Sequence, residues 1–252
     1  MNTTKTSPIQ VIDRMSALLD ALATEEGGAS LKILAAETSL HPSTAFRIMA
    51  ALIEHDFVAR DDHGQYRLGP HLLSLAAKAR VGLDVRGLAR PEMEWLRDQV
   101  GETVNLTVRQ GDEVVYVERV TPNRMMRVEQ VVGSRAPLHV TAVGKLMLGE
   151  IGAAAIRDYA KRTRLQAYTA NTRADLQTLL EDVGACAARG YALDDEEAEL
   201  GVGCIGALVR DASGTAVAGL SVSAPMERRR AEWVPLVQEA ARRISVRLGF
   251  AG

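Results

Sequence analysis

The chain has little of the chemistry that supports metal centres or disulfide frameworks. Its 252 residues include only two cysteines, Cys186 and Cys204, and five histidines. The cysteines form no CxxC pair and no histidines stand at metal-ligand spacing, so we expect no bridges, no metal and no cofactor. No apolar run is long enough to cross a bilayer, and the N-terminus lacks the pattern of a secretory signal. These absences favour a protein of the reducing cytoplasm, away from the membrane.

Overall positive charge, the usual mark of a nucleic-acid-binding protein, is also missing. The 30 lysines and arginines stand against 32 aspartates and glutamates, which gives a formal net charge of -2. Any contact with DNA must therefore depend on where the charges are placed. A catalytic set is missing as well, because there is no GxSxG motif and nothing in the sequence brings His139 to Ser221 or Asp194. We therefore do not expect an enzyme.

The segment from Ser39 to His55 is typical of an amphipathic helix. Pro42 suits the first helical position, where its missing N–H would be unpaired anyway. Apolar residues then recur at helical spacing and form one stripe: Ala45, Ile48, Met49, Leu52 and Ile53. The other face begins with side chains that can reach a phosphate or a base edge: Ser43, Thr44, Phe46 and Arg47. A DNA recognition helix needs this arrangement, although an ordinary core helix would show the same pattern.

The preceding segments make the DNA-binding interpretation more specific. Apolar periodicity predicts helices over residues 8–24 and 31–38, and Ser30 is a good N-cap for the second. A short turn then leads into the helix at Pro42. Two short helices joined by so tight a turn are typical of a helix-turn-helix.

The segment that follows the predicted recognition helix reads as a β-hairpin. Two extended runs within residues 57–68 flank an Asp62-His63-Gly64 turn. A hairpin directly after a helix-turn-helix is a wing. Arg60 and Arg67 lie on its two strands and could hold the sugar–phosphate backbone, although each alone could equally be a solvated surface arginine. Taken together, the helices and the hairpin favour DNA binding.

The rest of the chain predicts a linker helix and a mixed α/β domain. Pro70 opens a short apolar helix, which we interpret as a linker that packs on its copy in a second subunit, the alternative being its own wing. From Thr103 the pattern changes to strands. Strands are predicted over 103–120, which form a hairpin, and over 125–132, 204–210 and 216–223. Helices are predicted up to about residue 100 and over 141–148, 152–162, 173–189 and 227–248. Loops are predicted at 133–137 and around Asp194 and Asp195.

Three pieces of this domain look suited to a small ligand. The helix at Thr141 begins with small residues, so we expect the backbone N–H groups of Ala142, Val143 and Gly144 to be open to a carboxylate or phosphate. An ionised Asp194 would accept a hydrogen bond from a ligand hydroxyl. Ser221 and Ser223 alternate on one strand and so share a face. Each piece also has a purely structural interpretation, as a capped helix, a turn aspartate or serines bonded to nearby backbone, and Cys204 alone would be a small buried hydrophobe.

The chain resembles the IclR family of bacterial transcriptional regulators over nearly its full length. In the N-terminal part the resemblance rests on Ser43-Thr-Ala-Phe-Arg-Ile-Met-Ala-Ala-Leu and on Tyr66-Arg-Leu-Gly69. In the C-terminal part it rests on three motifs: the run from Val132 to Lys145, Gly190-Tyr-Ala-Leu-Asp-Asp-Glu-Glu197 with Gly201 and Cys204, and Val217-Ala-Gly-Leu-Ser-Val-Ser223.

The resemblance implies an α+β protein with three parts. These are a winged helix-turn-helix DNA-binding domain at 8–69, a linker helix at 70–83, and a GAF-like effector-binding and oligomerisation domain with an antiparallel sheet at 84–252. Members are usually homodimers or homotetramers that bind a palindromic DNA operator and respond to a small metabolite, often an organic or aromatic acid. Their effector pocket is lined at the positions of Ala142, Val143, Asp194, Cys204, Ser221 and Ser223.

We therefore predict a ligand-responsive transcriptional regulator. Ser43, Thr44, Phe46, Arg47, Arg60 and Arg67 are its predicted DNA-binding residues. The apolar pair Ala142-Val143 leaves only backbone donors at that helix start and indicates a ligand with an apolar part. The alternative is a DNA-binding oligomer whose C-terminal domain is structural and binds no effector. The choice between repressor and activator, the operator, the effector and the choice between dimer and tetramer stay open.

Overall fold

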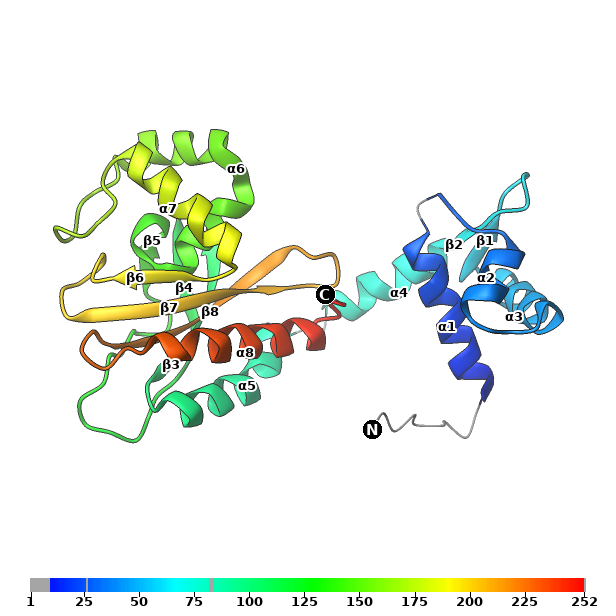
Figure 1. Cartoon of the computed structure of the whole chain (residues 1–252), viewed down its shortest axis with the longest axis horizontal. Helices are drawn as coiled ribbons and strands as arrows, with labels where there is room; N and C mark the ends of the chain where they lie inside the picture. The colour runs from blue at the N-terminus through cyan, green and yellow to red at the C-terminus, as the bar shows by residue number, and fades with distance from the viewer. Residues whose placement is uncertain (1–9, 26, 82–83, 252) are drawn as a thin grey trace. The chain divides into compact units, whose positions relative to one another are not determined.

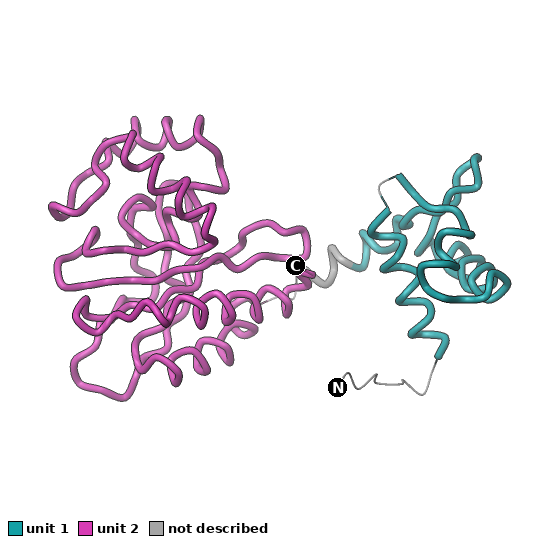
Figure 2. The backbone as a smooth tube through the Cα atoms, viewed as in Figure 1, with its two compact units in different colours: residues 1–83 teal, residues 84–252 magenta. Residues whose placement is uncertain are grey.

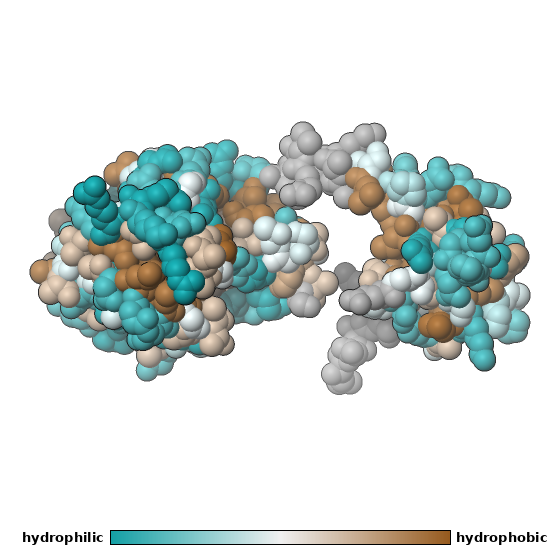
Figure 3. Space-filling view, turned by 90° about the horizontal axis from the view of Figure 1, so that it is seen from above, coloured by the Kyte–Doolittle hydropathy of each residue, from teal (hydrophilic) through white to brown (hydrophobic). Residues whose placement is uncertain are grey.

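The computed structural model describes residues 10–25, 27–81 and 84–251, with side chains left undescribed over 76–81. The chain divides into two compact units, residues 1–83 and 84–252 (Figure 2). Each unit has its own buried apolar core, so each is described by itself. Among the described residues no helix is long and apolar enough to cross a membrane. In the view of Figure 3, hydrophilic side chains cover much of the surface of both units, with smaller hydrophobic patches between them.

The first unit is a helix-turn-helix followed by a short hairpin. Its elements are α1 (Gln10–Thr24), α2 (Leu31–Glu37), α3 (Pro42–Glu54), β1 (Val58–Arg60), β2 (Tyr66–Leu68) and α4 (Pro70–Val81). The first two residues of the helix predicted over 8–24 lie outside the described residues. Ser30 caps α2 as predicted, because its side chain accepts a hydrogen bond from the backbone N–H of Ile33.

The apolar stripes of the three helices meet in the core of the first unit. Leu18 of α1, Leu34 of α2 and Met49 of α3 are fully buried there. Tyr66 of β2 joins the same core, and its backbone pairs with Ala29 just before α2. This bridge holds the hairpin against the helices, so the wing has a fixed place beside the helix-turn-helix.

The second unit is a six-stranded antiparallel sheet with helices on both faces (Figure 1). The strand order across the sheet is β5-β4-β3-β8-β7-β6. Its elements are α5 (Val85–Val100), β3 (Thr103–Gln110), β4 (Glu113–Val120), β5 (Arg135–Pro137), the 3-10 turn η1 (Leu138–Val140), α6 (Ala142–Thr163), α7 (Leu176–Arg189), β6 (Ala192–Asp195), β7 (Val202–Arg210), β8 (Ala216–Pro225), the 3-10 turn η2 (Ala231–Trp233) and α8 (Val234–Arg247).

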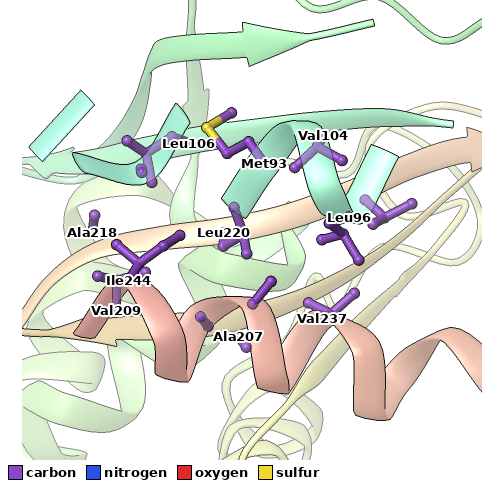
Figure 4. Close-up of a cluster of buried hydrophobic side chains, with 14 of the residues drawn as sticks. Met93, Leu96, Val104, Leu106, Ala207, Val209, Ala218, Leu220, Val237 and Ile244 are labelled. Atoms are coloured by element: carbon purple, nitrogen blue, oxygen red, sulfur yellow. The ribbon is translucent and has the colours of Figure 1, made fainter. Parts of the chain in front are cut away.

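The two faces of the sheet differ in chemistry. Alternate residues of the central strands, such as Leu106, Leu220 and Ala207, pack under α5 and α8, where Met93 and Ile244 complete an apolar core (Figure 4). The opposite face lies under α6 and α7 and carries polar residues at its centre, because Thr103, Asn105, Ser221 and Ser223 are all buried. A polar face inside a folded domain requires either internal hydrogen-bond partners or a ligand.

Three local predictions for this unit are wrong. Residues 125–132 form no strand, because they are tied to the sheet through side chains rather than through a backbone ladder. The short strand β5 lies instead in the predicted 133–137 loop, where it pairs with the start of β4. Asp194 and Asp195 belong to edge strand β6 rather than to a loop, since Asp194 pairs with Cys204. By contrast, the two helices predicted over 141–148 and 152–162 are both present within α6, and the break between them falls at Gly152, where φ is 79°.

Candidate functional site

The N-terminal end of α3 carries most of the polar residues predicted to contact DNA. His41 caps the helix, because its Nδ1 accepts from the backbone N–H of Ser43 at 3.4 Å and lies 2.8 Å from the Ser43 hydroxyl. Ser43, Phe46 and Arg47 are exposed, and Thr44 is half-buried. With 51% of its surface accessible, Phe46 is unusually exposed for an aromatic residue. The helix therefore presents a polar and aromatic end while its apolar stripe faces the core.

The two wing arginines are exposed but each has a partner within the hairpin. Arg60 Nε donates to the carbonyl oxygen of Gly64 at 3.4 Å, and its guanidinium lies over the Tyr66 ring. Arg67 pairs with Asp61 at 3.5 Å. Backbone N–H donors in the turn hold the pKa of the Asp61 carboxyl below its usual range. Arg47, by contrast, makes no hydrogen bond or ion pair with any residue that the structure describes, so it is available to a partner.

The second unit contains a cavity of about 210 Å³ on the polar face of its sheet. Five of the six residues predicted to bind an effector line it: Ala142, Val143, Asp194, Cys204 and Ser221. These residues come from α6, β6, β7 and β8, which are distant in sequence. The sixth, Ser223, lies next to the lining, with its hydroxyl 3.2 Å from Cys204 Sγ. The fold therefore brings all six residues together, whereas their role in binding stays a prediction.

The N-terminus of α6 forms one wall of this cavity. Thr141 caps the helix, because its hydroxyl accepts from the backbone N–H of Gly144 at 3.1 Å. Glycines on the sheet allow the helix to lie directly on it: a Cβ at Gly219 would come within 2.6 Å of the Val143 Cβ, and one at Gly206 within 2.8 Å of its Cγ1. Free N–H groups at a helix start favour an anion, so the chemistry of this wall suits a carboxylate.

Asp194 is the ionisable group most deeply buried in the lining, with 3% of its surface accessible. Its Oδ1 accepts from the backbone N–H of Glu197 at 2.8 Å. Burial raises its pKa to about 6. The neighbouring cations have other partners: Arg229 bonds the backbone oxygen of Asp194 and pairs with Asp195, and Lys145 lies between two other carboxylates. A ligand hydroxyl or N–H could therefore donate to a carboxylate that no side-chain cation neutralises.

Hydrogen bonds between side chains run along the sheet beside the cavity. Asn105 Nδ2 donates to Ser223 Oγ at 3.1 Å, and Ser223 in turn contacts Cys204 Sγ. Burial, together with the charge of Asp194, raises the pKa of the Cys204 thiol, so Cys204 is a neutral thiol at physiological pH. Burial is also the largest cause that raises the pKa of Tyr116, which lies in the lining on β4. A neutral thiol and a neutral phenol leave Asp194 as the only one of these three groups that ionises near neutral pH.

A buried ion-pair cluster supports the wall that carries Asp194. Lys145 of α6 bonds Asp182 of α7 at 2.7 Å and also bonds Glu197, which follows β6. Burial alone would lower the pKa of Lys145, but these two carboxylates raise it overall. Glu197 donates its backbone N–H to Asp194, so the cluster helps to position the Asp194 carboxylate. Nothing in the sequence pattern distinguished Lys145 from a surface lysine.

Sequence reasoning missed several lining residues and correctly set aside a triad. The lining residues missed on the β4 side include Tyr116, Gln130 and Ser134, and those on the β6 side include Glu199 and Val202. Alternation along β4 could have identified Tyr116, but no pattern marks a loop residue such as Gln130.

His139 bonds the Tyr159 hydroxyl and the carbonyl oxygen of Gln166 with its two ring nitrogens, so His139 forms no Ser-His-Asp triad. Among the described residues no cluster of His, Cys, Asp and Glu could hold a metal ion.

The chain joins a winged helix-turn-helix with an exposed polar end to a unit whose cavity is lined by both polar and apolar residues. This combination is typical of DNA-binding regulators that carry their own small-molecule sensor.

Comparison with known proteins identifies the family within this class. The IclR helix-turn-helix domain matches residues 11–62, and the bacterial transcriptional regulator IclR C-terminal domain matches residues 77–246. The chain is 33% identical over 246 residues to the HTH-type transcriptional repressor AllR of Escherichia coli (strain K12), covering 96% of this chain and 91% of AllR. It is 34% identical to AllR of Klebsiella pneumoniae, and the match covers 96% of this chain and 90% of that AllR. The crystal structure of the Agobacterium tumefaciens repressor BlcR matches with a TM-score of 0.79 at 30% identity. The match covers 97% of this chain and 99% of the BlcR chain.

The chain therefore belongs to the IclR family of transcriptional regulators. The predicted family is confirmed, as is the predicted fold class of an N-terminal helix-turn-helix with a C-terminal antiparallel-sheet domain. The family and the matched relatives are transcriptional regulators rather than enzymes, which confirms that prediction too. The assignment of individual residues to DNA or effector stays a prediction.

Proposed function

We propose that the protein represses transcription from a palindromic operator and that a small organic acid in its C-terminal cavity changes its affinity for that operator. The observation that carries the proposal is the cavity itself, where α6, β6, β7 and β8 each supply residues predicted to bind an effector. Repression is proposed because the matched curated relatives are named repressors. A protein that regulates bacterial transcription acts on DNA in the cytoplasm, so we propose that this protein is cytoplasmic.

Two copies of the chain are needed to read a palindrome. The α3 helices of a dimer would enter successive major grooves about 34 Å apart. Arg47 is the proposed reader of a base or phosphate, Ser43 and Thr44 would hold the backbone, and Phe46 would contact a thymine methyl. The wing arginines Arg60 and Arg67 would add phosphate contacts, as a wing lies beside the groove.

Helix α4 is the proposed first contact between the two copies. Leu73 and Leu75 expose large parts of their apolar side chains, 75% and 43% respectively. Pairing of two α4 helices would bury these groups and place two DNA-binding units together. Whether two such dimers associate further is a matter for measurement of the molar mass in solution.

In the cavity we propose that the carboxylate of the effector binds the backbone N–H groups of Ala142 and Val143, while a donor on the effector bonds Asp194. Ser221 and Ser223 would complete the polar floor, and the thiol of Cys204 would contact the apolar part of the ligand. The effector can act only if it binds two quaternary arrangements with different affinity. The separation of the two α3 helices is the quantity that would differ between them.

Thermal unfolding of the full-length protein with a panel of organic and aromatic acids tests the proposal. An acid present at about 100 times its Kd stabilises the bound unit by about 2.7 kcal/mol, which raises the melting temperature measurably. Asp194→Ala should remove this shift while operator binding by the free protein persists. Operator binding without a shift from any acid would instead support the structural alternative for the C-terminal domain.

A further inference from the structure

The segment between β4 and β5, residues 121–134, lies against the polar face of the sheet, and we call it the strap. Backbone bonds join its end to the sheet, because Gly133 donates to the carbonyl oxygen of Tyr116 at 2.7 Å and Tyr116 donates to Ser134 at 3.1 Å. Its middle is held by Thr103, whose hydroxyl donates to the carbonyl oxygen of Val128 at 2.6 Å. The strap is therefore fixed to the sheet although it forms no strand.

A buried carboxylate anchors the beginning of the strap. Glu102, with 1% of its surface accessible, accepts from Arg124 of the strap at 2.8 Å and from Arg228 at 2.7 Å. Arg228 also donates to the carbonyl oxygen of Met126. Hydrogen bonds to a charged group are stronger than those between neutral groups. The strap thus has a defined position before any ligand binds.

Gln130 is the strap residue whose side chain reaches the cavity with a free donor. It lines the cavity, and its Oε1 accepts from Asn105 Nδ2 at 3.0 Å. Arg119 donates to its backbone oxygen, so the main chain at this point is fixed as well. Within the described part of the chain the Nε2 amide of Gln130 donates to no acceptor. A fixed amide with an unused donor at a cavity wall is suited to recognise an acceptor.

Asn105 holds the Gln130 amide by its oxygen. Asn105 is fully buried on β3, beside Ser221, and its Nδ2 donates both to Gln130 and to Ser223. Because both bonds use its amide nitrogen, Asn105 requires an oxygen from Gln130, which leaves the Gln130 nitrogen for the ligand. The Oδ1 of Asn105 is buried and has no hydrogen-bond partner among the residues that the structure describes. A buried polar atom of this kind is costly unless a water or ligand satisfies it.

We propose that Gln130 determines effector specificity by donating from Nε2 to an oxygen acceptor on the effector other than its carboxylate. This inference rests on the proposed function. The cavity of about 210 Å³ is small for a ligand pocket, so it suits a compact acid. The ligand class is then a small carboxylic acid with a second, carbonyl-type oxygen, in preference to an acid whose other end is wholly apolar.

Matched pairs of acids test this inference on the full-length protein. Butanoate is compared with acetoacetate, and pentanoate with levulinate, because each pair differs by one ketone oxygen. Calorimetry of the wild type should show about tenfold tighter binding of at least one keto acid than of its plain partner, the factor expected from one uncharged hydrogen bond. Gln130→Glu keeps the oxygen that Asn105 requires and replaces the amide donor with an acceptor. It should abolish the preference.

Controls separate this inference from the proposed function. Gln177→Glu makes the same charge change on the exposed face of α7 and should keep the wild-type preference. Gln130→Met, which has similar length and no donor, replaces Gln130→Glu if that variant does not fold. A preference that survives in the Gln130 variant, or that is absent from a wild type that binds these acids, overturns the role of Gln130 alone. If none of the four acids binds the wild type, the inference falls, and the broader acid panel decides the proposed function.

Discussion

The two units of this regulator present their predicted functional groups in opposite ways. In the first unit Ser43, Phe46 and Arg47 stand exposed on a helix end. In the second unit Asp194 and Ser223 are buried, with 3% and 1% of their surfaces accessible. DNA is larger than the unit that reads it and can meet a convex surface. A small acid gains specificity only where the protein surrounds it and removes water from its polar groups.

Burial also changes the chemistry of the groups it encloses. The pKa of Asp194 rises to about 6, whereas Asp61 in the exposed wing has a pKa below its usual range. The stability of the second unit therefore depends on paired charges and on close packing. DNA binding by the first unit depends instead on the positions of single charges.

Replacement of the buried lysine should destabilise only the second unit. Lys145→Met leaves Glu197 and Asp182 without their common partner, and removing one partner of a buried ion pair costs about 3–5 kcal/mol. Both tryptophans of the chain, Trp95 and Trp233, lie in residues 84–252, so tryptophan fluorescence during denaturation follows that unit. Lys161→Ala on the exposed part of α6 should change the free energy of unfolding little.

Titration of Asp194 should make the stability of the second unit depend on pH. Burial raises the pKa of Asp194 from 3.8 to about 6 in the folded state, so the folded protein holds this proton more tightly than the unfolded chain does. Protonated Asp194 therefore contributes fully to stability below about pH 4. This contribution is lost as the pH rises through about 6, which lowers the free energy of unfolding by about 3 kcal/mol. Wild type should therefore lose stability relative to Asp194→Asn across this window. A difference in the free energy of unfolding between the two proteins that does not change with pH would contradict this prediction.

A methyl group under the start of α6 should disrupt the cavity. Gly219→Ala places a Cβ within 2.6 Å of Val143 Cβ, and overpacking of this kind costs about 1–3 kcal/mol. The variant should lose its thermal response to acids and still bind the operator. Gly184→Ala on α7 is the matched control, since a Cβ there meets nothing within 4 Å. Equal acid responses in the two variants would show that the helix start is not the anion site.

Loss of the exposed arginine should affect only DNA binding. Arg47→Ala should weaken operator binding by about 1–3 kcal/mol if Arg47 contacts a base. The measurement is a gel shift at one fixed salt concentration, because phosphate contacts depend on salt. Arg157→Ala on exposed α6 is a control of equal charge. Unchanged operator affinity in Arg47→Ala would remove this residue from the interface.

The helix-turn-helix was accessible to prediction because its helices carry local signals. Pro42 at the first position of α3 and the Ser30 cap each act within a few residues, so their effects can be read without the fold. The hairpin of β3 and β4 was predicted for the same reason, from alternation around a glycine turn.

Features that depend on contacts between distant segments were harder to predict. Residues 125–132 have strand-like composition, yet Thr103 and Asn105 hold them by side-chain bonds, and the edge of β4 is taken by β5. The motif residues of the cavity followed from the family resemblance. Lys145 and Gln130 did not, because a buried lysine and a loop glutamine acquire their roles only from partners distant in sequence.

We propose that the cavity of the second unit and the exposed helix α3 of the first unit are coupled. The most direct test is to measure operator affinity with and without a bound acid, and acid affinity with and without operator, on the same full-length protein. Linkage requires both measurements to give the same factor, and we predict a factor of about 5–150. A factor of one in both, with the acid bound in the cavity, would show that the two sites are not coupled.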